Sequence, residues 1–444
     1  MKRPGGTSSQ PQPAGSRKWL ALGACIVAMM AIANVQYAWT LFTIPLQERL
    51  GASLTAIQWA FGLFILTETW MMPFHTWLVD RFGARVVVAV AGVIVGASWI
   101  GSGLATSVEV LWIDYAFAGI GVGAVYGACV GVVVKTFPER RGLCVGATVG
   151  AYGFGTALTV IPISRMIAWA GYSKTFIVWG IIQGTIVIAT AWFMKAPRSA
   201  KHGNNQGQAA PSIPSIKVAL ERSNRDYTPI EMLRSGSFYL MYAMMALVAC
   251  GGLMVTAQLG PIASSFGHDK KVIIAGLTAL QVALLLDRIV NGFTRPFWGW
   301  VSDRIGRYDT MALAFGLEAV AIACLTLTVH KPTLFVLMTG FTFFAWGEIY
   351  SLFPTAIADM YGSKYATTNF GLQYTSKGVA SILAGPGAAL LMLVTHSWVP
   401  VLLAALVMDL GAALLAFFWL KPLMRRRILE ELWTEDSVRE AVPH

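Results

Sequence analysis

The chain has 444 residues, of which 56% are hydrophobic and only 12% are charged, and its mean hydropathy is +0.61. Soluble domains carry about 25% charged residues, so this composition excludes a soluble protein, and the long apolar runs favour membrane helices over a β-barrel. The formal net charge is +11, but the basic residues lie in short loops and tails between the apolar runs, which argues against nucleic acid as a partner.

Twelve apolar segments predict an all-α, polytopic membrane protein with twelve transmembrane helices in two six-helix bundles. The segment that begins at Trp19 is too long for a signal-peptide core, so we interpret it as an uncleaved first span. The expected helices are 19–43, 54–79, 85–106, 109–136, 142–168, 173–194, 237–265, 272–301, 309–329, 332–358, 367–394 and 397–421. The expected divisions are an N-terminal tail at 1–18, a bundle at 19–194, a polar linker at 195–236 with a short helix near 216–223, a second bundle at 237–421 and a C-terminal tail at 422–444.

The basic residues also predict the orientation. With a cytoplasmic N-terminus, the inner loops and tails hold 24 Lys and Arg and the outer loops hold six. Because cytoplasmic loops carry the excess of Lys and Arg, both termini are expected in the cytoplasm, with the chain in the cell membrane, the inner membrane of a bacterium. The remaining basic residues, Arg288, Arg295 and Lys377, lie within spans.

Small residues and prolines mark some of these spans. Glycines spaced by about four residues predict close helix packing in the fourth and fifth spans. Pro162 and Pro386 are expected to kink the fifth and eleventh spans. The glycines are Gly119, Gly123, Gly127 and Gly131 in the fourth span and Gly146, Gly150, Gly153 and Gly155 in the fifth.

Two similar loops recur six spans apart. The chain reads TWLVDRFGAR at 76–85, after the second span, and GWVSDRIGR at 299–307, after the eighth. We expect the Asp to cap the next helix or bind its amides, the Arg to bridge to a neighbouring helix end and the Gly to permit the turn. The pattern resembles the major facilitator superfamily, with the signature GxxxDRxGR, although the first copy begins with Thr76. This resemblance implies two bundles that rock about a central substrate site, with gating-loop residues Asp80, Arg81, Asp303 and Arg304.

Arg295 and Lys377 are the most informative charges, because they lie at similar depth in the eighth and eleventh spans. A charge at the bilayer centre is costly, so it usually pairs or lines a cavity. Two cations at one depth suit a small anion, and an aromatic surround suits a planar carboxylate. In the first span, Gln36 and Tyr37 share one turn. The alternative is structural pairing with a buried acid; those available are Glu68, Asp287, Glu318, Glu348 and Asp409.

Longer matches are similar to the oxalate:formate antiporter family: NVQYAWTLF at 34–42, RPFWGWVSDRIGR at 295–307 and WGEIYSLFP at 346–354. The resemblance implies that Arg295 and Lys377 bind the anion while aromatic residues close over it. The candidate substrate-binding residues are thus Arg295, Lys377, Gln36, Tyr37, Tyr126, Tyr152, Trp346, Tyr350 and Tyr374. This chain departs by having Tyr374 where the antiporter has Trp, and charged residues at positions that look uncharged there, namely Glu68, Asp287, Arg288 and Glu348.

Glu68 lies 12 residues before Asp80, near the middle of the bilayer, and its counterpart in the other half is Asn291. Glu68, Asp287 and Arg288 are therefore candidate coupling residues, which brings protons into question as a partner. The predicted function is secondary active transport of short mono- or dicarboxylates as an oxalate:formate-type antiporter working by alternating access. The alternative is a proton-coupled symporter or uniporter for monocarboxylates such as pyruvate or lactate.

An enzyme is not expected. The chain has no GxSxG, HExxH or Walker pattern, and neither a CxxC nor a His-rich cluster. No metal and no cofactor is therefore predicted.

Overall fold

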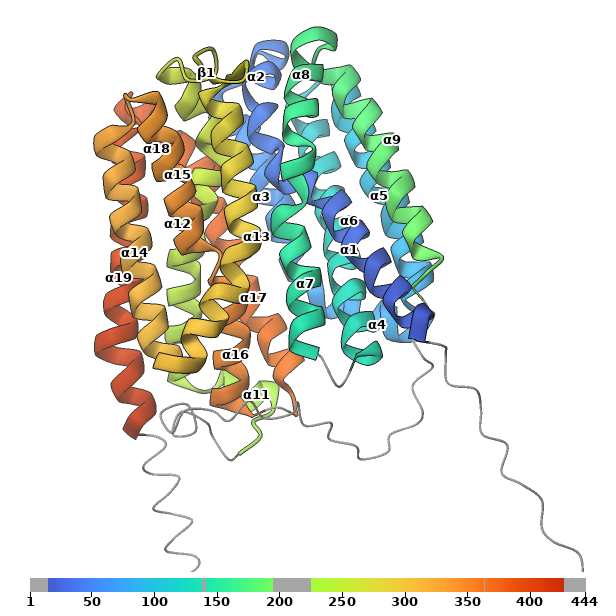
Figure 1. Cartoon of the computed structure of the whole chain (residues 1–444), viewed down its shortest axis with the longest axis vertical. Coiled ribbons are helices and arrows are strands. Elements are labelled where there is room, and N and C mark those ends of the chain that lie inside the picture. The colour runs from blue at the N-terminus through green and yellow to red at the C-terminus, as the bar shows by residue number, and fades with distance from the viewer. Residues whose placement is uncertain (1–14, 138–140, 195–224, 363, 427–444) are drawn as a thin grey trace, which may run out of the picture.

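The computed structural model describes residues 15–137, 141–194, 225–362 and 364–426, and nearly all of its elements are helices (Figure 1). The N-terminal half contains α1 (Gly15–Tyr37), η1 (Trp39–Leu41), α2 (Thr43–Leu50), α3 (Leu54–Trp70), α4 (Met72–Phe82), α5 (Ala84–Leu104), α6 (Val108–Thr136), α7 (Arg141–Phe154), η3 (Gly155–Leu158), α8 (Val160–Ala170) and α9 (Tyr172–Ala191). The C-terminal half contains α11 (Pro229–Leu233), α12 (Gly236–Ser265), β1 (Val272–Ile274), β2 (Leu277–Thr278), α13 (Ala279–Ile305), α14 (Arg307–Thr328), α15 (Pro332–Trp346), α16 (Ile349–Tyr361), α17 (Ala366–Ile382), η4 (Leu383–Gly387), α18 (Ala388–Thr395), α19 (Val399–Leu415) and η5 (Ala416–Leu420).

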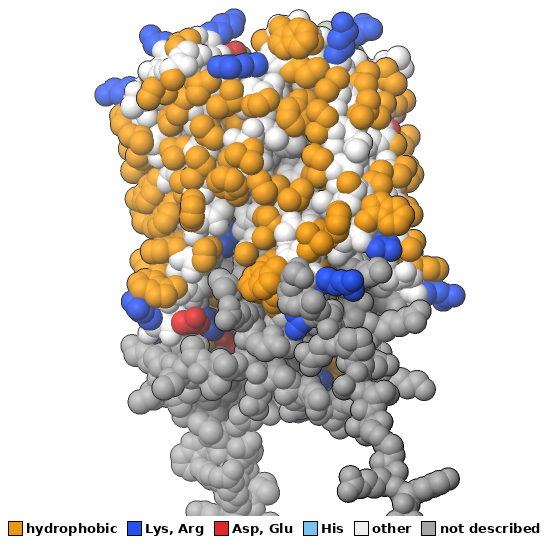
Figure 2. All heavy atoms as spheres, turned by 45° about the vertical axis from the view of Figure 1, so that its right-hand side comes forward, with side chains coloured by type: hydrophobic (Ala, Val, Ile, Leu, Met, Phe, Trp, Pro, Cys, Tyr) orange, Lys and Arg blue, Asp and Glu red, His pale blue; other side chains and the backbone are white. Residues whose placement is uncertain are grey.

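Ten helical segments of the described chain are long and apolar enough to cross a membrane. The other two expected spans are the α3–α4 segment, which is interrupted at Met71, and α13, which carries Asp287, Arg288 and Arg295. Apolar side chains cover the sides of the molecule, and Lys and Arg gather toward its two ends (Figure 2). This distribution is what a bilayer requires, so the all-α polytopic class predicted from the sequence is confirmed.

Several expected spans are broken rather than continuous. Pro386 lies inside the π-helical turn η4, as expected for a residue that lacks the N–H needed for the helical hydrogen bond. The fifth span is interrupted at η3, just before Pro162. The tenth span also breaks, between Trp346 and Ile349. At each break the regular helical repeat is interrupted, so the helical segments before and after it do not share one continuous face.

The predicted start of the eighth span at residue 272 is wrong. Residues 272–278 form the antiparallel hairpin of β1 and β2, and α13 begins at Ala279. Ala275 and Gly276 have φ of 49° and 74°, a backbone conformation that ends a helix. Thr278 and Gln281 then form a capping box that starts α13. The short helix predicted near 216–223 lies outside the described residues.

Glycines of both helices meet where α5 packs against α9. A Cβ atom on Gly96 would come within 3.1 Å of the Gly180 carbonyl oxygen, and one on Gly184 within 3.0 Å of the Gly92 oxygen. This contact was not predicted from the sequence. It did predict close packing on α6, where a Cβ atom on Gly123 would lie 2.6 Å from the Glu68 carbonyl oxygen. Glu68 of α3 therefore lies at the level of Gly123, where α3 and α6 cross.

The two halves are joined at the end that carries α2, α8 and the β1–β2 hairpin, at the top of Figure 1, which we call the hairpin end. Gln58 donates to the Ala257 carbonyl oxygen (2.9 Å) and to Gln258 (3.1 Å), and accepts from Trp39 (3.0 Å). Gln281 also donates to Ser164 across the halves, at 3.0 Å. The structure is therefore closed by hydrogen bonds at the hairpin end, which the predicted orientation places outside the cytoplasm.

We expect Gln58→Ala to shift the protein toward a conformation that is open at the hairpin end. The change removes two hydrogen bonds between the halves, together worth about 1–3 kcal/mol, and leaves the Trp39 indole without its acceptor. Spin labels at Arg49→Cys and Lys271→Cys, in a Cys324→Ser background, should report a longer distance by pulsed electron resonance. Gln183→Ala removes another buried glutamine, one with no hydrogen bond among the described residues, and serves as the control. An unchanged distance distribution in Gln58→Ala would contradict the expectation.

Candidate functional site

Lys377 and Glu68 form an ion pair across the interface of the two halves. The Lys377 Nζ atom of α17 lies 3.0 Å from Glu68 Oε2 of α3, and neither side chain is more than 1% exposed. The same ammonium group donates to Gln36 Oε1 and to the Tyr374 hydroxyl, both at 3.3 Å. Tyr152 donates to Gln36 (2.9 Å) and approaches the other Glu68 oxygen at 3.5 Å. The counter-ion of Lys377 in this structure is therefore a residue of the protein, Glu68.

Arg295 also reaches from one half to the other. Its Nη1 atom donates to the Val149 carbonyl oxygen of α7 at 2.5 Å, and its Nη2 atom donates to Asn291 Oδ1, one turn away, at 3.2 Å. The guanidinium lies over the Tyr350 ring, 4.3 Å from the ring centroid. Both hydrogen-bond acceptors are neutral groups. The charge of Arg295 consequently has no counter-ion within ion-pair distance in the described chain.

Arg288 lies two turns from Arg295 on α13 and is clamped between two aromatic rings. Its Cζ atom is 4.2 Å from the Tyr37 ring centroid and 4.3 Å from that of Phe343. Such cation–π contacts stabilise a buried guanidinium. Asp287 precedes it in the chain and interacts with it electrostatically, although neither Asp287 oxygen has a hydrogen-bond partner among the described residues.

The predicted aromatic residues surround these charges. The Tyr126 ring stacks on Tyr374 across the halves at 6.4 Å and meets Tyr152 edge-on at 5.6 Å. Tyr350 meets Tyr374 at 6.4 Å. Trp346 lies behind Tyr350, at 5.7 Å, and packs against Gly252 of α12. The structure thus brings all nine predicted substrate-binding residues into one connected cluster, with Trp346 in its outer layer.

Several buried polar atoms of this cluster have no hydrogen-bond partner in the described part of the chain. They include Gln36 Nε2, Tyr37 Oη, Asn291 Nδ2, Arg295 Nε, Trp346 Nε1 and Tyr350 Oη. Buried polar groups are normally satisfied, because an unmade hydrogen bond costs about 1–3 kcal/mol. Each of these atoms is able to donate a hydrogen bond. These donors therefore lack acceptors within reach among the described residues, which a bound anion would supply.

Glu68 is surrounded by side chains from many helices. Its charge interacts with tyrosines of α1, α6, α7, α16 and α17, in addition to Lys377. His75, also buried, packs with the Glu68 backbone against Gly123. The titratable groups around Glu68 are Tyr37, Tyr126, Tyr152, Tyr350, Tyr374, Lys377 and, near its backbone, His75.

The two repeated loops lie at the end opposite the hairpin end. Their glycines, Gly83 and Gly306, have φ of 83° and 99°, so the predicted turns are confirmed. Asp303 does not cap α14 as expected; it accepts from Arg307 at 2.7 Å, and Arg307 also pairs with Asp359 at 3.1 Å. Arg307 lies four residues after Asp303, so its guanidinium reaches the Asp303 carboxylate, which then does not cap the amides of α14.

The two loop arginines also differ from expectation. Arg81 and Arg304 do not bridge to neighbouring helices through any described ion pair, but lie over tryptophans of their own helices, Trp77 at 5.3 Å and Trp300 at 3.6 Å. A guanidinium at the membrane boundary finds such a ring within one turn of its own helix. The predicted role of Asp80 falls on a side chain outside the described part of the structure.

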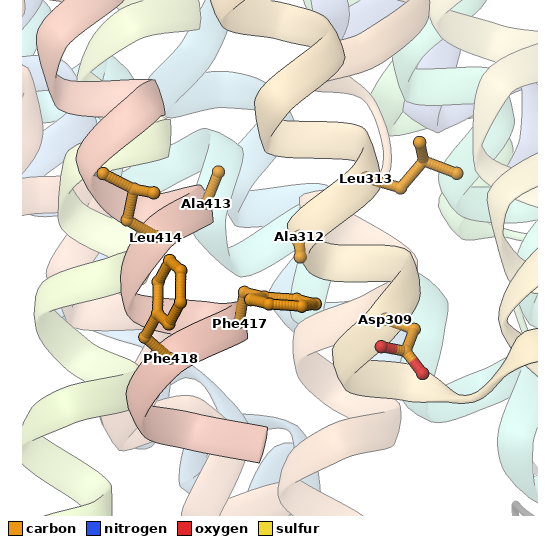
Figure 3. A pocket seen from close by; sticks show the side chains of 7 residues that line it. All are labelled: Asp309, Ala312, Leu313, Ala413, Leu414, Phe417 and Phe418. Atoms are coloured by element: carbon orange, nitrogen blue, oxygen red, sulfur yellow. The ribbon is translucent and has the colours of Figure 1, made fainter. Parts of the chain in front are cut away.

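A separate groove of about 380 Å³ lies on the outside of the C-terminal half, between α14 and the α19–η5 segment (Figure 3). Apolar residues line most of it, and Asp309 at one end pairs with Lys421. It shares no residue with the cluster around Arg295 and Lys377. We therefore do not interpret it as the substrate site.

Sequence reasoning missed some contributors to the cluster. Phe343, which covers Arg288, and the Val149 carbonyl oxygen, which accepts from Arg295, were not predicted. A phenylalanine in an apolar span carries no distinguishing signal, and a backbone acceptor carries none at all. Gln58 was also missed, although a lone glutamine in an apolar segment is itself a signal of an interhelical hydrogen bond.

Together, the fold and the buried charges at the interface of its halves define an all-α polytopic membrane protein. The family model of the Major Facilitator Superfamily matches residues 24–291 and 278–435. The chain belongs to the major facilitator superfamily and is therefore a multi-pass membrane transporter.

Curated relatives are similar over most of the chain. The oxalate:formate antiporter of Oxalobacter formigenes is 34% identical over 375 residues, covering 84% of this chain and 85% of that protein. Monocarboxylate transporter 12 of Mus musculus is 21% identical over 465 residues, covering 97% and 93%. A probable sulfoacetate transporter of Cupriavidus necator is 26% identical over 412 residues, covering 90% and 92%.

Proposed function

We propose that this protein transports short carboxylate anions by alternating access and binds them between Arg295 and Lys377. The names of its relatives support an organic anion as the substrate: oxalate and formate, a monocarboxylate, and sulfoacetate. In the proposed orientation both termini are cytoplasmic and the protein lies in the cell membrane, the inner membrane of a bacterium. Both ends of the described chain lie at the same end of the molecule, as this orientation requires (Figure 1).

The observation that carries the proposal is the surplus of buried hydrogen-bond donors around an unpaired guanidinium. Arg295 has no counter-ion in the described chain, and the unpartnered atoms of Tyr37, Asn291 and Tyr350 belong to the same cluster. An ionised carboxylate is an acceptor-only group with about four lone-pair sites. One carboxylate therefore supplies both the missing charge and the missing acceptors.

The transport mode that the similarity to the oxalate:formate antiporter favours is exchange of two anions. A closed and dry site with uncompensated cations is unfavourable, so a carrier of this kind returns across the membrane mainly when it is loaded. Arg295 supports this mode, because none of the described residues compensates its charge.

The Glu68–Lys377 pair favours a second mode, net transport by a uniporter or a proton-coupled symporter of monocarboxylates. Lys377 already has a counter-ion, Glu68, at 3.0 Å. Of the two cations proposed to bind the substrate, only Arg295 is then uncompensated. This lowers the barrier to return of the empty carrier. Glu68 is the carboxyl group that contacts Lys377, so binding of a proton to Glu68 would change the charge of the site.

Purified protein in proteoliposomes tests both parts of the proposal. We expect uptake of labelled short carboxylates above that of protein-free vesicles. Exchange requires an anion inside the vesicle, whereas net transport fills empty vesicles and, if proton-coupled, follows an imposed pH gradient. A thermal-shift screen of mono- and dicarboxylates should identify ligands, because binding to the folded state raises its apparent stability. Absence of both uptake and thermal shift across the series would reject carboxylate transport.

We expect Gly153→Ala to reduce carboxylate uptake strongly, whereas Gly146→Ala on the same helix should leave it near wild type. A Cβ atom on Gly153 would meet Asn291 Oδ1 at 2.6 Å and Arg295 Nη2 at 3.2 Å, so it displaces the guanidinium from its position. A Cβ atom on Gly146 meets nothing within 4 Å. The loss should be on the order of 10-fold or more, as for small misplacements of a binding group. Equal uptake by the two variants would show that the position of Arg295 is not critical.

A further inference from the structure

We propose that Glu68 determines the charge of the substrate: by neutralising Lys377 it makes this site selective for anions with one carboxylate over anions with two. The inference rests on the proposed function and specifies the substrate class of the same site. It differs from a role in proton coupling, because it concerns which anion is accepted rather than how transport is driven.

The first step concerns the hydrogen bonds of Lys377. An ammonium group has three donors and no acceptor. In this structure the three neighbours of Nζ are Glu68 at 3.0 Å, Gln36 at 3.3 Å and Tyr374 at 3.3 Å. Its donors are thus fully used before any substrate arrives. A substrate carboxylate reaches Lys377 only by displacing one of these groups.

The second step is a count of charges at the interface. The cations are Arg288, Arg295 and Lys377, and the acids are Glu68 and Asp287. Glu68 compensates Lys377 in an ion pair, and Asp287 interacts with its neighbour Arg288. With both acids ionised, one positive charge, that of Arg295, remains. A monoanion makes this interface neutral, whereas a dianion leaves it with a net negative charge.

The third step is the place where the substrate would bind. The unpartnered donors around Arg295 are its own Nε atom, the hydroxyl of Tyr350, whose ring underlies the guanidinium, and the Nδ2 atom of Asn291. These groups suit one carboxylate, and in the proposed site between Arg295 and Lys377 the uncharged end of the same anion lies toward Lys377. A second carboxylate directed at Lys377 would meet the Glu68 carboxylate, a like charge in a site that excludes water. Like charges repel strongly there, because the surroundings screen them poorly.

Oxalate and oxamate provide a matched pair of ligands for the test. Oxamate has the shape of oxalate, but an uncharged amide replaces one carboxylate, so the two differ in charge and hardly in size. We expect oxamate to stabilise the purified wild-type protein and to compete for uptake at lower concentration than oxalate does. The reverse order in the wild type would overturn the inference regardless of any variant.

The matched variants are Glu68→Gln and Glu348→Gln. Glu68→Gln keeps the shape but frees the Lys377 charge, so the ratio of oxalate to oxamate affinity should rise by about tenfold or more, as expected for the removal of one nearby like charge. Glu348 is equally buried, but no contact with Lys377 is described for it, so Glu348→Gln should leave the ratio unchanged. Glu68→Asp retains the charge and should keep the wild-type preference.

The outcomes separate this inference from the proposed function. If both ligands bind and Glu68→Gln leaves their ratio unchanged, the charge role of Glu68 is wrong while carboxylate binding stands. If neither ligand nor any other short carboxylate binds the wild type or the variants, the proposed function fails, and this inference fails with it. If Glu68→Gln does not fold, the order of oxamate and oxalate in the wild type and in Glu68→Asp still decides.

Discussion

Arg295→Gln should abolish carboxylate transport while the protein still inserts into the membrane and folds. Glutamine removes the charge that lacks a counter-ion in the described chain and the contact with the Tyr350 ring, but it leaves no buried acid behind. Removing one partner of a buried, charged hydrogen-bonded pair costs about 2–5 kcal/mol, which is roughly 30-fold to more than 1,000-fold in affinity. Uptake into proteoliposomes and ligand-induced thermal shift should both be lost.

Arg295→Lys separates charge from geometry. Lysine keeps the positive charge but offers a point charge instead of a planar fork, so it cannot donate to Val149 and Asn291 as the guanidinium does. We expect weak residual transport. Arg165→Gln, an exposed residue at the hairpin end of α8, is the control for loss of a positive charge. Wild-type uptake by Arg295→Gln would show that the substrate binds elsewhere.

The depth of the site residues could be predicted from the sequence, but their partners could not. Counting 12 residues back from Asp80 placed Glu68 near the middle of the bilayer, and the structure puts it in contact with Lys377. The two are 309 positions apart, and their contact depends on how the two halves dock. One sequence fixes the height of a residue along its helix far better than the direction in which its side chain points.

The errors in the predicted fold have a similar origin. Residues 272–278 include Val272, Ile273 and Ile274, whose hydropathy suits a membrane helix as well as a strand, so the hairpin was missed. Periodicity cannot separate the two in so short an apolar run. The break of the tenth span between Trp346 and Ile349 was missed because Gly347 alone is a weak signal; the structure gives its reason, since a Cβ atom there would collide with Thr294 of α13. Tertiary contacts decided both points.

Lys377→Gln should also abolish transport, but for two reasons that a second substitution can separate. The variant loses a cation of the proposed binding site, and it leaves the Glu68 carboxylate buried without its partner. Breaking a buried ion pair from one side costs about 3–5 kcal/mol, whereas replacing both charges by neutral groups is often nearly free. We therefore expect a lower melting temperature for Lys377→Gln, which the double variant Glu68→Gln/Lys377→Gln restores.

Transport should not be restored together with stability. The double variant has a neutral, hydrogen-bonding pair in place of the ion pair, so it folds, but it offers the substrate no ammonium group. Melting temperature and carboxylate uptake, measured on the same preparations of the wild type, both single variants and the double variant, decide the matter. If the double variant recovers uptake along with its melting temperature, Lys377 serves only to neutralise Glu68. If it recovers stability alone, Lys377 contributes directly to binding, and Glu68 is the group that holds its charge in the empty carrier.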